Sequence, residues 1–384
     1  MRRLTLHIGA HKTATNTLRR TLEHNEYLLR AKGLGLACLG NTPPVRQFLG
    51  FLDPDKIFPQ GFTIQNPTAF AKVVAQPGED HVFLSSENFS FIFQQTVLDE
   101  FALALSRHFD QIDILVYLRR QDRHAVSHHQ EGAQADRLPE AVLWGHSLNA
   151  LPEPSDLQRL YLDYDARLRL WENAFGSHAL CVGLFDRAMM AQGDIVADAL
   201  SRMGIDPSGL TRIEDQNVSL GRVQASVGHL ANDTLADPAV TGSLIAALPY
   251  AGAKLLPCAQ AARDFLAPYV ASNRRLNERL QISTNPDLFS DDFSDYPQGS
   301  PEGLGADEWA AALRVAMTTL GPRYSATKDL TPDDLRKAAV ALEHKDAPAA
   351  LRLARAAHVL RPEGPRIKQL KADLEARLNP PFTA

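Results

Sequence analysis

Residues 7–17, with the sequence His-Ile-Gly-Ala-His-Lys-Thr-Ala-Thr-Asn-Thr, are the part of the chain best suited to bind an anion. A strand-like run ends there, a tight turn follows, and a helix-like run begins near Thr15. The first turn of a helix offers free backbone N–H groups and the positive end of the helix dipole. Lys12 adds a mobile positive charge, and Thr13, Thr15 and Thr17 add hydroxyl donors. This segment, called the phosphate loop below, therefore predicts a site for a phosphate or a similar anion.

The phosphate loop differs from a Walker A nucleotide-binding motif. That motif reads G-x-x-x-x-G-K-[ST], whereas Lys12 follows His11 and has only Gly9 upstream. Residues 112–118 form the strongest strand-like run in the chain, and two arginines follow it where a magnesium-binding acid would be usual. Arginines at that place favour direct binding of a second phosphate over the holding of a metal ion.

The second motif lies in residues 117–127, where Ser127 follows Arg119 by eight residues. A planar guanidinium can make two parallel, charge-assisted hydrogen bonds to a phosphate. A hydroxyl from the helix expected after the strand would complete such a site. Arg120 is the alternative to Arg119 if the strand ends one residue later.

Together the two motifs resemble those of sulfotransferases that depend on 3′-phosphoadenosine 5′-phosphosulfate (PAPS), and in particular a bacterial branch with loops of the form H-x-G-x-H-K-T-[AG]-T. The resemblance covers residues 1 to about 290. It implies that the phosphate loop binds the 5′-phosphosulfate, with Lys12 at the bridging oxygen, and that the second motif binds the 3′-phosphate. The donor-binding residues that it implies are His11, Lys12, Thr13, Ala14, Thr15, Asn16, Arg119 and Ser127.

Two positions depart from the family's pattern. Ala14 stands where most members carry glycine, so its backbone must adopt a conformation that an alanine can reach. Asn16 stands where threonine or serine is usual, which makes its contact with the donor the least secure of the set.

The resemblance implies transfer of a sulfuryl group from PAPS to an acceptor hydroxyl or amine, with a saccharide or another small molecule as the favoured acceptor. A sulfuryl group carries less charge than a phosphoryl group, so Lys12 can supply the stabilisation that a metal gives elsewhere. We therefore expect PAPS as the donor and no metal. The alternatives are a P-loop transferase of the kinase type that uses Mg-ATP, and a non-catalytic nucleotide-binding scaffold.

Transfer to an acceptor usually needs a base that removes the acceptor's proton. Glu87 is the first candidate, because it comes just after a buried strand-like run at residues 81–85. It could equally cap the next helix or orient Lys12. His11, His128 and His129 are the other candidates. His124 and His128 have the i, i+4 spacing of a zinc-binding pair, but no third ligand stands out nearby, and two histidines lining a polar cleft is the better interpretation.

Alternating strand-like and helical segments predict an α/β fold, of the P-loop-like three-layer type with a central parallel sheet. The expected strands are residues 4–8, 81–85, 112–118 and 179–185. Residues 41–77 are rich in Pro, Gly, Asn and Gln, and we expect them to form a long surface excursion that could recognise the acceptor.

The C-terminal part of the chain has a different pattern, because strand-like runs become rare after about residue 215 and helical runs dominate. Gly-Ser-Pro-Glu-Gly at residues 299–303 indicates a boundary between a sulfotransferase domain, residues 1–300, and a helical C-terminal subdomain, residues 305–384. Thr331 followed by Pro332 predicts a capped helix start. Residues 348–360 and 365–378 then predict a helical hairpin of the tetratricopeptide (TPR) type.

Composition narrows the class of protein. The chain has 384 residues and a formal net charge of −5, which argues against broad binding to nucleic acid or to an anionic membrane. Its three cysteines lie far apart and predict no disulfide framework. We find neither a signal-peptide pattern nor a membrane-length apolar run, and we expect a cytoplasmic protein without membrane insertion.

Overall fold

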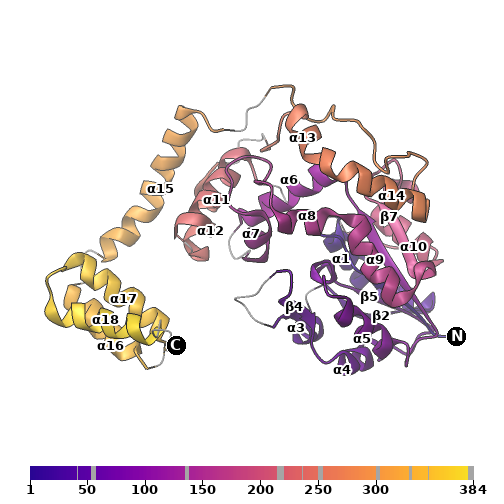
Figure 1. The fold of residues 1–384 in the computed structure, drawn as a ribbon, viewed down its shortest axis with the longest axis horizontal. Coiled ribbons are helices and arrows are strands. Elements are labelled where there is room, and N and C mark those ends of the chain that lie inside the picture. Colours follow the sequence, from indigo (N-terminus) through magenta and orange to yellow (C-terminus); the bar gives the residue numbers. More distant parts are fainter. Residues whose placement is uncertain are drawn as a thin grey trace. The chain divides into compact units, whose positions relative to one another are not determined.

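A computed structural model describes residues 1–40, 42–52, 58–134, 138–213, 220–235, 237–249, 254–299, 303–327, 331–344 and 346–378. The chain falls into two compact units, Met1–Trp309 and Ala310–Ala384 (Figure 1).

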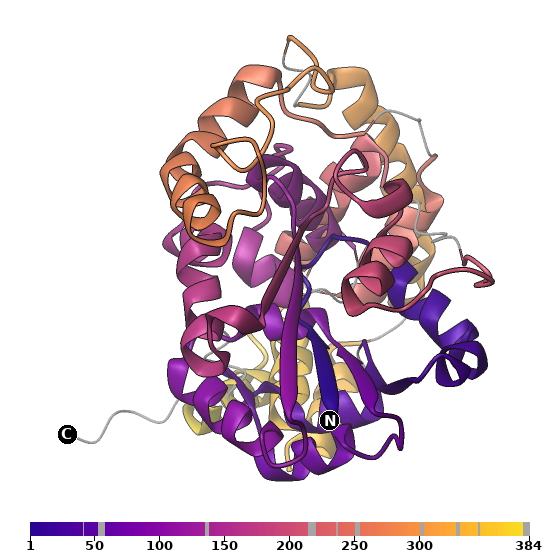
Figure 2. The same cartoon turned by 90° about the vertical axis from the view of Figure 1, so that its right-hand side faces the viewer.

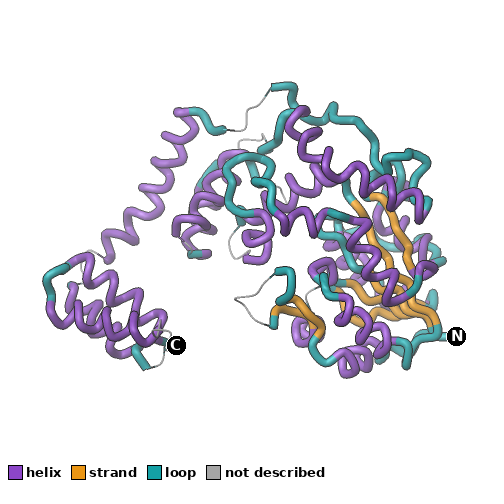
Figure 3. The backbone as a smooth tube through the Cα atoms, viewed as in Figure 1, coloured by secondary structure: helices purple, strands orange, loops and turns teal. Residues whose placement is uncertain are grey.

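A five-stranded parallel sheet forms the centre of the first unit (Figure 3). Its order is β2-β5-β1-β6-β7, and β1 pairs with β5 on one side and β6 on the other. The strands are β1 (Arg3–His7), β2 (Leu34–Leu39), β5 (His81–Ser85), β6 (Gln111–Leu118) and β7 (Leu180–Leu184). The expected α/β fold with a central parallel sheet is confirmed, and β2 is a strand that the sequence analysis did not predict.

Helices cover both faces of the sheet, which makes the unit three-layered (Figure 2). Successive side chains of a strand point to opposite faces. Leu4 and Leu6 of β1 pack in one core with α4 (Pro67–Val74), α5 (Gln95–Leu105) and α9 (Tyr164–Phe175).

The second face carries its own core, in which Leu115 and Tyr117 of β6 meet three helices. These are α1 (Thr15–His24), α2 (Glu26–Ala31) and α10 (Ile195–Met203). Leu18 and Leu22 of α1 are fully buried there, because residues four apart share one helix face.

The prediction of a surface excursion over residues 41–77 is wrong. The described part of this stretch contains α3 (Pro43–Phe48), a two-stranded antiparallel sheet of β3 (Leu49–Phe51) and β4 (Phe62–Ile64), and α4. Phe70 and Val74 of α4 are fully buried, with the i, i+4 spacing of a packed helix face. The many proline, glycine, asparagine and glutamine residues of this stretch made its short apolar runs hard to recognise, although these runs pack into the main core.

Further helices lie beyond the carboxyl ends of the strands or pack around the three layers. They are α6 (Gln121–Gly132), α7 (Leu138–Trp144), α8 (Asp156–Leu162), α11 (Arg222–Leu235), α12 (Pro238–Ala247), α13 (Ala259–Leu266) and α14 (Val270–Leu280). Helix α6 follows β6 directly and packs against α7 and α13. No helix in the described ranges is both long enough and apolar enough to cross a bilayer.

The second unit is helical. Helix α15 (Ala306–Thr327) crosses the division between the units, and α16 (Pro332–Leu342), α17 (Ala347–Leu360) and α18 (Pro365–Leu378) follow. Thr331 caps α16 in a reciprocal arrangement with Asp334, as its sequence predicts. The small core of this unit consists of Ala339, Ala350, Leu351, Ala354 and Leu374.

Candidate functional site

The phosphate loop continues from the central strand β1 and is held against β6. The N–H of Ala10 donates to the carbonyl of Tyr117 at 3.1 Å, and the N–H of Tyr117 donates to the carbonyl of Gly9 at 2.8 Å. The hydroxyl of Thr13 donates to the carbonyl of Ala10 at 2.7 Å. These bonds fix the turn before α1 begins, so its backbone is pre-formed.

Two non-glycine residues of the loop have left-handed backbones, Lys12 with φ 61° and Ala14 with φ 57°. A left-handed conformation costs an L-residue roughly 1–2 kcal/mol relative to the right-handed one. Ala14 therefore does adopt the conformation for which the resembling family uses glycine. It is the residue immediately before α1, so this conformation sets the direction in which the helix leaves the loop.

The expected hydroxyl donors of the loop have separate surroundings. Thr13 is buried and engaged with the loop's own backbone. Thr15 is buried too, and its hydroxyl donates to a carboxylate oxygen of Glu87. Asn16 is exposed, and Thr17 is half-buried. The side chains that can reach a bound anion without breaking an internal bond are thus those of Asn16 and Thr17.

Arg119 connects the two motifs. Its guanidinium donates to the carbonyl of Lys12 at 3.0 Å, although the two residues are 107 positions apart in sequence. The hydroxyl of Tyr164 donates to the carbonyl of Arg119 at 2.7 Å and holds the end of β6 in place. Burial lowers the pKa of Arg119, yet a guanidinium stays charged at neutral pH. A cationic group therefore touches the backbone of the phosphate loop.

Arg120, the alternative to Arg119, is engaged inside the protein. It forms an ion pair with Asp122 at 2.8 Å, donates to the carbonyl of Ser290 at 2.8 Å, and lies over the ring of Phe293 at 4.0 Å. Its side chain is only 5% exposed. These contacts account for Arg120 without a ligand.

A cavity of about 510 Å³ adjoins Arg119 and is called the arginine cavity below. Ala14 and Thr17 contribute to it from the phosphate loop, and Arg119 lies 5.7 Å from the ring centre of Phe185. Its lining also includes Arg123, Asp186, Arg187, Met190, Gly193, Asp194 and Ile195. The three guanidinium groups outnumber the two carboxylates of the lining, and together with one aromatic ring they suit an anionic ligand with a flat ring.

Ser127 lies on α6, one helical turn after Arg123 and on the same face. It is half-buried, and among the described residues it lines neither the arginine cavity nor an adjoining hollow of about 500 Å³ that Arg119, Arg123 and Phe185 share. The structure thus brings Arg119 to the phosphate loop and leaves Ser127 behind Arg123.

A second cavity, of about 690 Å³, also borders the phosphate loop and is called the carboxylate cavity below. Glu87, Glu131 and Glu140 line it, together with His11, Thr15 and Asn16 from the loop and from α1. Its remaining lining residues are Arg19, Leu39, Gly40, Thr42, Arg46, Leu49, Gly50, Phe51, Phe62, Ser85, Ser86, Asn88 and Phe91. Part of this wall comes from the segment expected to recognise the acceptor.

Glu87 lies at the start of a short 3₁₀ helix (Glu87–Phe91), just after β5. The residue that caps this helix is Ser86, whose hydroxyl accepts from the N–H of Asn88 at 3.3 Å. The carboxylate of Glu87 instead accepts from Thr15 and lines the carboxylate cavity. Its position therefore suits a proton acceptor beside the phosphate loop.

The histidines suggested as alternative bases have different environments. Burial lowers the pKa of His11 to about 3, and its Nδ1 lies 2.8 Å from the hydroxyl of Tyr161. Burial lowers the pKa of His129 to about 4, and its ring stacks on His229 at 4.1 Å. In the described lining of the carboxylate cavity His129 does not occur. Both imidazoles are neutral at pH 7, and their low basicity makes them poor proton acceptors.

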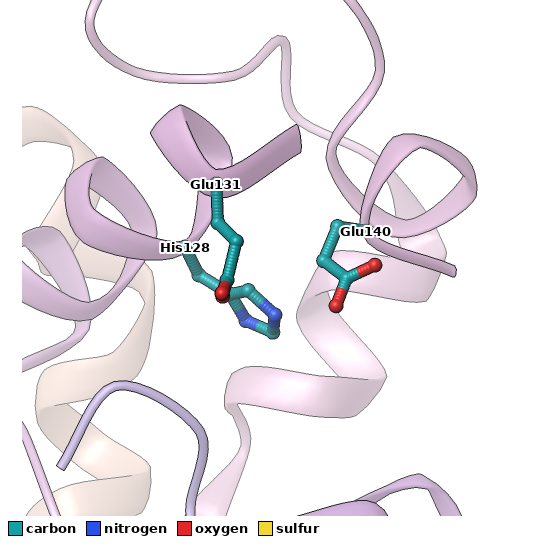
Figure 4. Close-up of side chains that lie close together, drawn as sticks. All are labelled: His128, Glu131 and Glu140. Atoms are coloured by element: carbon teal, nitrogen blue, oxygen red, sulfur yellow. The ribbon is translucent and has the colours of Figure 1, made fainter. Parts of the chain in front are cut away.

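Lys12 points toward the acidic side of the site. Its ammonium lies 3.6 Å from a carboxylate oxygen of Glu131, the last acidic residue of α6. Glu131, His128 and Glu140 lie close together (Figure 4). His124 is not in this group, and its Nδ1 lies 3.0 Å from the hydroxyl of Tyr164. No third ligand stands near His124 and His128 in the sequence, but the structure brings two carboxylates close to His128.

Among the functional candidates that the sequence did not reveal are Arg123, Glu131 and Glu140. Arg123 could have been found from its i, i+4 relation to Ser127, and Glu131 from its i, i+3 relation to His128. Glu140 carries no local signal, because it approaches the site from α7.

Comparisons with known proteins add little to this picture. No family model matches the chain. An uncharacterized protein of Archaeoglobus fulgidus is 29% identical over 123 residues, which are 32% of this chain and 31% of that protein. The crystal structure of a sulfotransferase from Alicyclobacillus acidocaldarius covers 75% of this chain and 100% of its own, with 16% identity and a TM-score of 0.41.

Proposed function

We propose that the chain is a sulfotransferase that moves a sulfuryl group from PAPS to an acceptor hydroxyl or amine. The observation that carries this proposal is the hydrogen bond from Arg119 to the carbonyl of Lys12, because it joins two anion-binding motifs from distant parts of the sequence. A donor with phosphates at both its 5′ and 3′ positions needs two such positive centres at a fixed separation.

The lining of the two cavities fits the two substrates of such a reaction. The arginine cavity would hold the 3′-phosphate and the adenine ring, using Arg119, Arg123, Arg187 and Phe185. The carboxylate cavity would hold the acceptor, with Glu87 placed to remove its proton. Both cavities border the phosphate loop, so donor and acceptor would meet there.

Each loop residue would then have a distinct task. The backbone N–H groups at the start of α1 would bind the 5′-phosphosulfate. The ammonium of Lys12 would leave Glu131 and stabilise the negative charge that grows on the departing phosphate. Thr15 would orient the carboxylate of Glu87 toward the acceptor.

Calorimetric titration with 3′-phosphoadenosine 5′-phosphate (PAP), compared with ATP plus Mg²⁺, tests this proposal. We expect PAP to bind without any metal and AMP to bind about one to two decades more weakly, because AMP lacks one charge-assisted contact. Tight binding of Mg-ATP together with weak binding of PAP would instead favour a phosphotransferase.

A further inference from the structure

Three side chains that commonly bind metals converge at the edge of the carboxylate cavity. His128 and Glu131 lie three residues apart on α6 and therefore share one helix face. Glu140 reaches them from α7, as Figure 4 shows. One ligand atom of each side chain lies within 4.8 Å of those of the other two. Glu131 and Glu140 line the cavity, whereas His128 is fully buried and approaches them from behind its described lining.

The type of ligand limits the kind of ion. Calcium and magnesium take oxygen ligands almost entirely, whereas imidazole together with carboxylates suits first-row transition metals and zinc. Three protein ligands also leave a coordination position open, as in catalytic rather than structural sites. We propose that His128, Glu131 and Glu140 bind one divalent ion of this class, such as Mn²⁺ or Zn²⁺, beside the carboxylate cavity.

The three side chains need only a small movement to coordinate an ion. Two ligand atoms at about 2.0–2.1 Å from a tetrahedral zinc are roughly 3.4 Å apart, so the separations in this group, which reach at most 4.8 Å, must shorten by up to about 1.4 Å. The ring of His128 is held by stacking on His11 at 4.8 Å and by the edge of Trp144 at 5.3 Å. Rotation of the two glutamate side chains would therefore provide most of the contraction.

Lys12 provides an electrostatic check on this assignment. Its ammonium lies 3.6 Å from the carboxylate of Glu131 and would compete with a metal ion for that carboxylate. A single positive charge within several ångströms of a divalent ion repels it even in water. The Lys12→Met variant should consequently bind the ion more tightly than the wild-type protein, by about tenfold.

The ion would give the carboxylate cavity a specific chemical role. Its open position can take a hydroxyl oxygen and lower the pKa of that hydroxyl, as metal ions do for bound water. This consequence rests on the proposed sulfotransferase function and points to an alcohol rather than an amine as acceptor. The metal site itself does not depend on the donor, so failure of PAP binding would leave it intact.

Manganese titration of the metal-free, full-length protein tests the site directly. Free Mn²⁺ is followed by electron paramagnetic resonance, and we expect one equivalent to bind. Pulsed resonance should show coupling to one imidazole nitrogen, and this coupling should vanish in His128→Gln. Loss of a ligand in Glu140→Gln should weaken binding by at least about 10–100-fold, the effect typical of disturbing even an outer-shell partner.

Two matched variants complete the experiment. Glu153→Gln changes an exposed glutamate, and His178→Gln changes an exposed histidine outside the carboxylate cavity. Both should retain wild-type affinity for Mn²⁺. Circular dichroism and melting temperature establish that each variant folds, and Glu140→Gln carries the test if His128→Gln does not. The proposal is overturned if the wild-type protein binds neither Mn²⁺ nor Zn²⁺ stoichiometrically, or if Glu140→Gln and Glu153→Gln bind Mn²⁺ equally well.

Discussion

The arginine cavity and the carboxylate cavity share the phosphate loop as a common wall, yet arginines outnumber carboxylates in the first and carboxylates outnumber arginines in the second. Ala14 and Thr17 border the first, and Thr15 and Asn16 border the second. Since residues three apart on a helix share a side and residues one or two apart point to different sides, a single helix start serves both cavities. Under the proposed function, this one loop would separate the site of the donor's phosphates from the site of proton removal. Changes on the two sides should therefore affect different measured quantities.

The largest expected effect lies on the carboxylate side. Glu87→Gln keeps the size of the side chain and its hydrogen bond with Thr15, but it removes the basic oxygen. Loss of a general base typically lowers turnover by about 10²–10⁴-fold. Turnover measured with an acceptor found by screening should fall by this factor, while affinity for PAP stays nearly unchanged. A near-normal rate would exclude Glu87 from the base role.

Lys12 lies between the two cavities and should affect chemistry more than binding. Lys12→Met removes the charge that would stabilise the departing phosphate, and loss of one such stabilising group costs about 10²–10³-fold in turnover. Its effect on PAP affinity should be much smaller, because the contact strengthens only in the transition state. Equal losses in turnover and PAP affinity would instead place Lys12 in ordinary ground-state binding.

The arginine cavity should show the reverse pattern. Arg119→Met removes a charge-assisted contact and should weaken PAP binding by about one to two decades. Binding of AMP should change far less, so the preference for PAP over AMP should shrink. Arg159→Met is a suitable control, because Arg159 is an exposed arginine on α8. If the PAP preference survives in Arg119→Met, the 3′-phosphate is bound elsewhere.

Acidic pH should lower the stability of the protein through His11, a buried histidine that lines the carboxylate cavity. Burial lowers the pKa of His11 from 6.5 to about 3, so the folded protein binds fewer protons than the unfolded chain. This group's contribution to stability is present above pH 6.5 and is lost as the pH falls toward 3, by about 1.4 kcal/mol per pH unit. Urea unfolding between pH 7 and pH 5 should show a shallower decline for His11→Gln. An identical decline in both proteins would contradict the burial of His11.

The smallest effect on stability and binding is expected at Ala14, in the phosphate loop that both cavities share. Ala14→Gly relieves a left-handed backbone that costs an alanine roughly 1–2 kcal/mol, while the extra freedom of glycine in the unfolded chain returns about 0.5–1 kcal/mol. The variant should thus be slightly more stable, and PAP binding should stay unchanged, because the loop keeps its path. Thermal unfolding measures the first effect and calorimetry the second. A destabilised Ala14→Gly would mean that the methyl group packs usefully.

Local patterns predicted the central part of the fold. Residues 4–8, 81–85 and 112–118 were short apolar runs between turn signals, and each became a strand of the parallel sheet. The runs that were missed or misjudged were weaker. β2 contains a glycine and directly follows another, and α4 lies among proline, asparagine and glutamine residues. Burial of such segments comes from packing against distant residues, which a local pattern cannot express.

The candidate site, like the fold, has one part that local sequence predicted and another that depends on contacts between distant residues. The sequence by itself determined the phosphate loop, because a strand, a turn and a helix start within eleven residues necessarily place backbone N–H groups and Lys12 together. Only the tertiary structure decided that Arg119 reaches the loop while Arg120 pairs with Asp122. It alone gathered Glu140 with His128, since α7 meets α6 through packing that no spacing along the chain encodes.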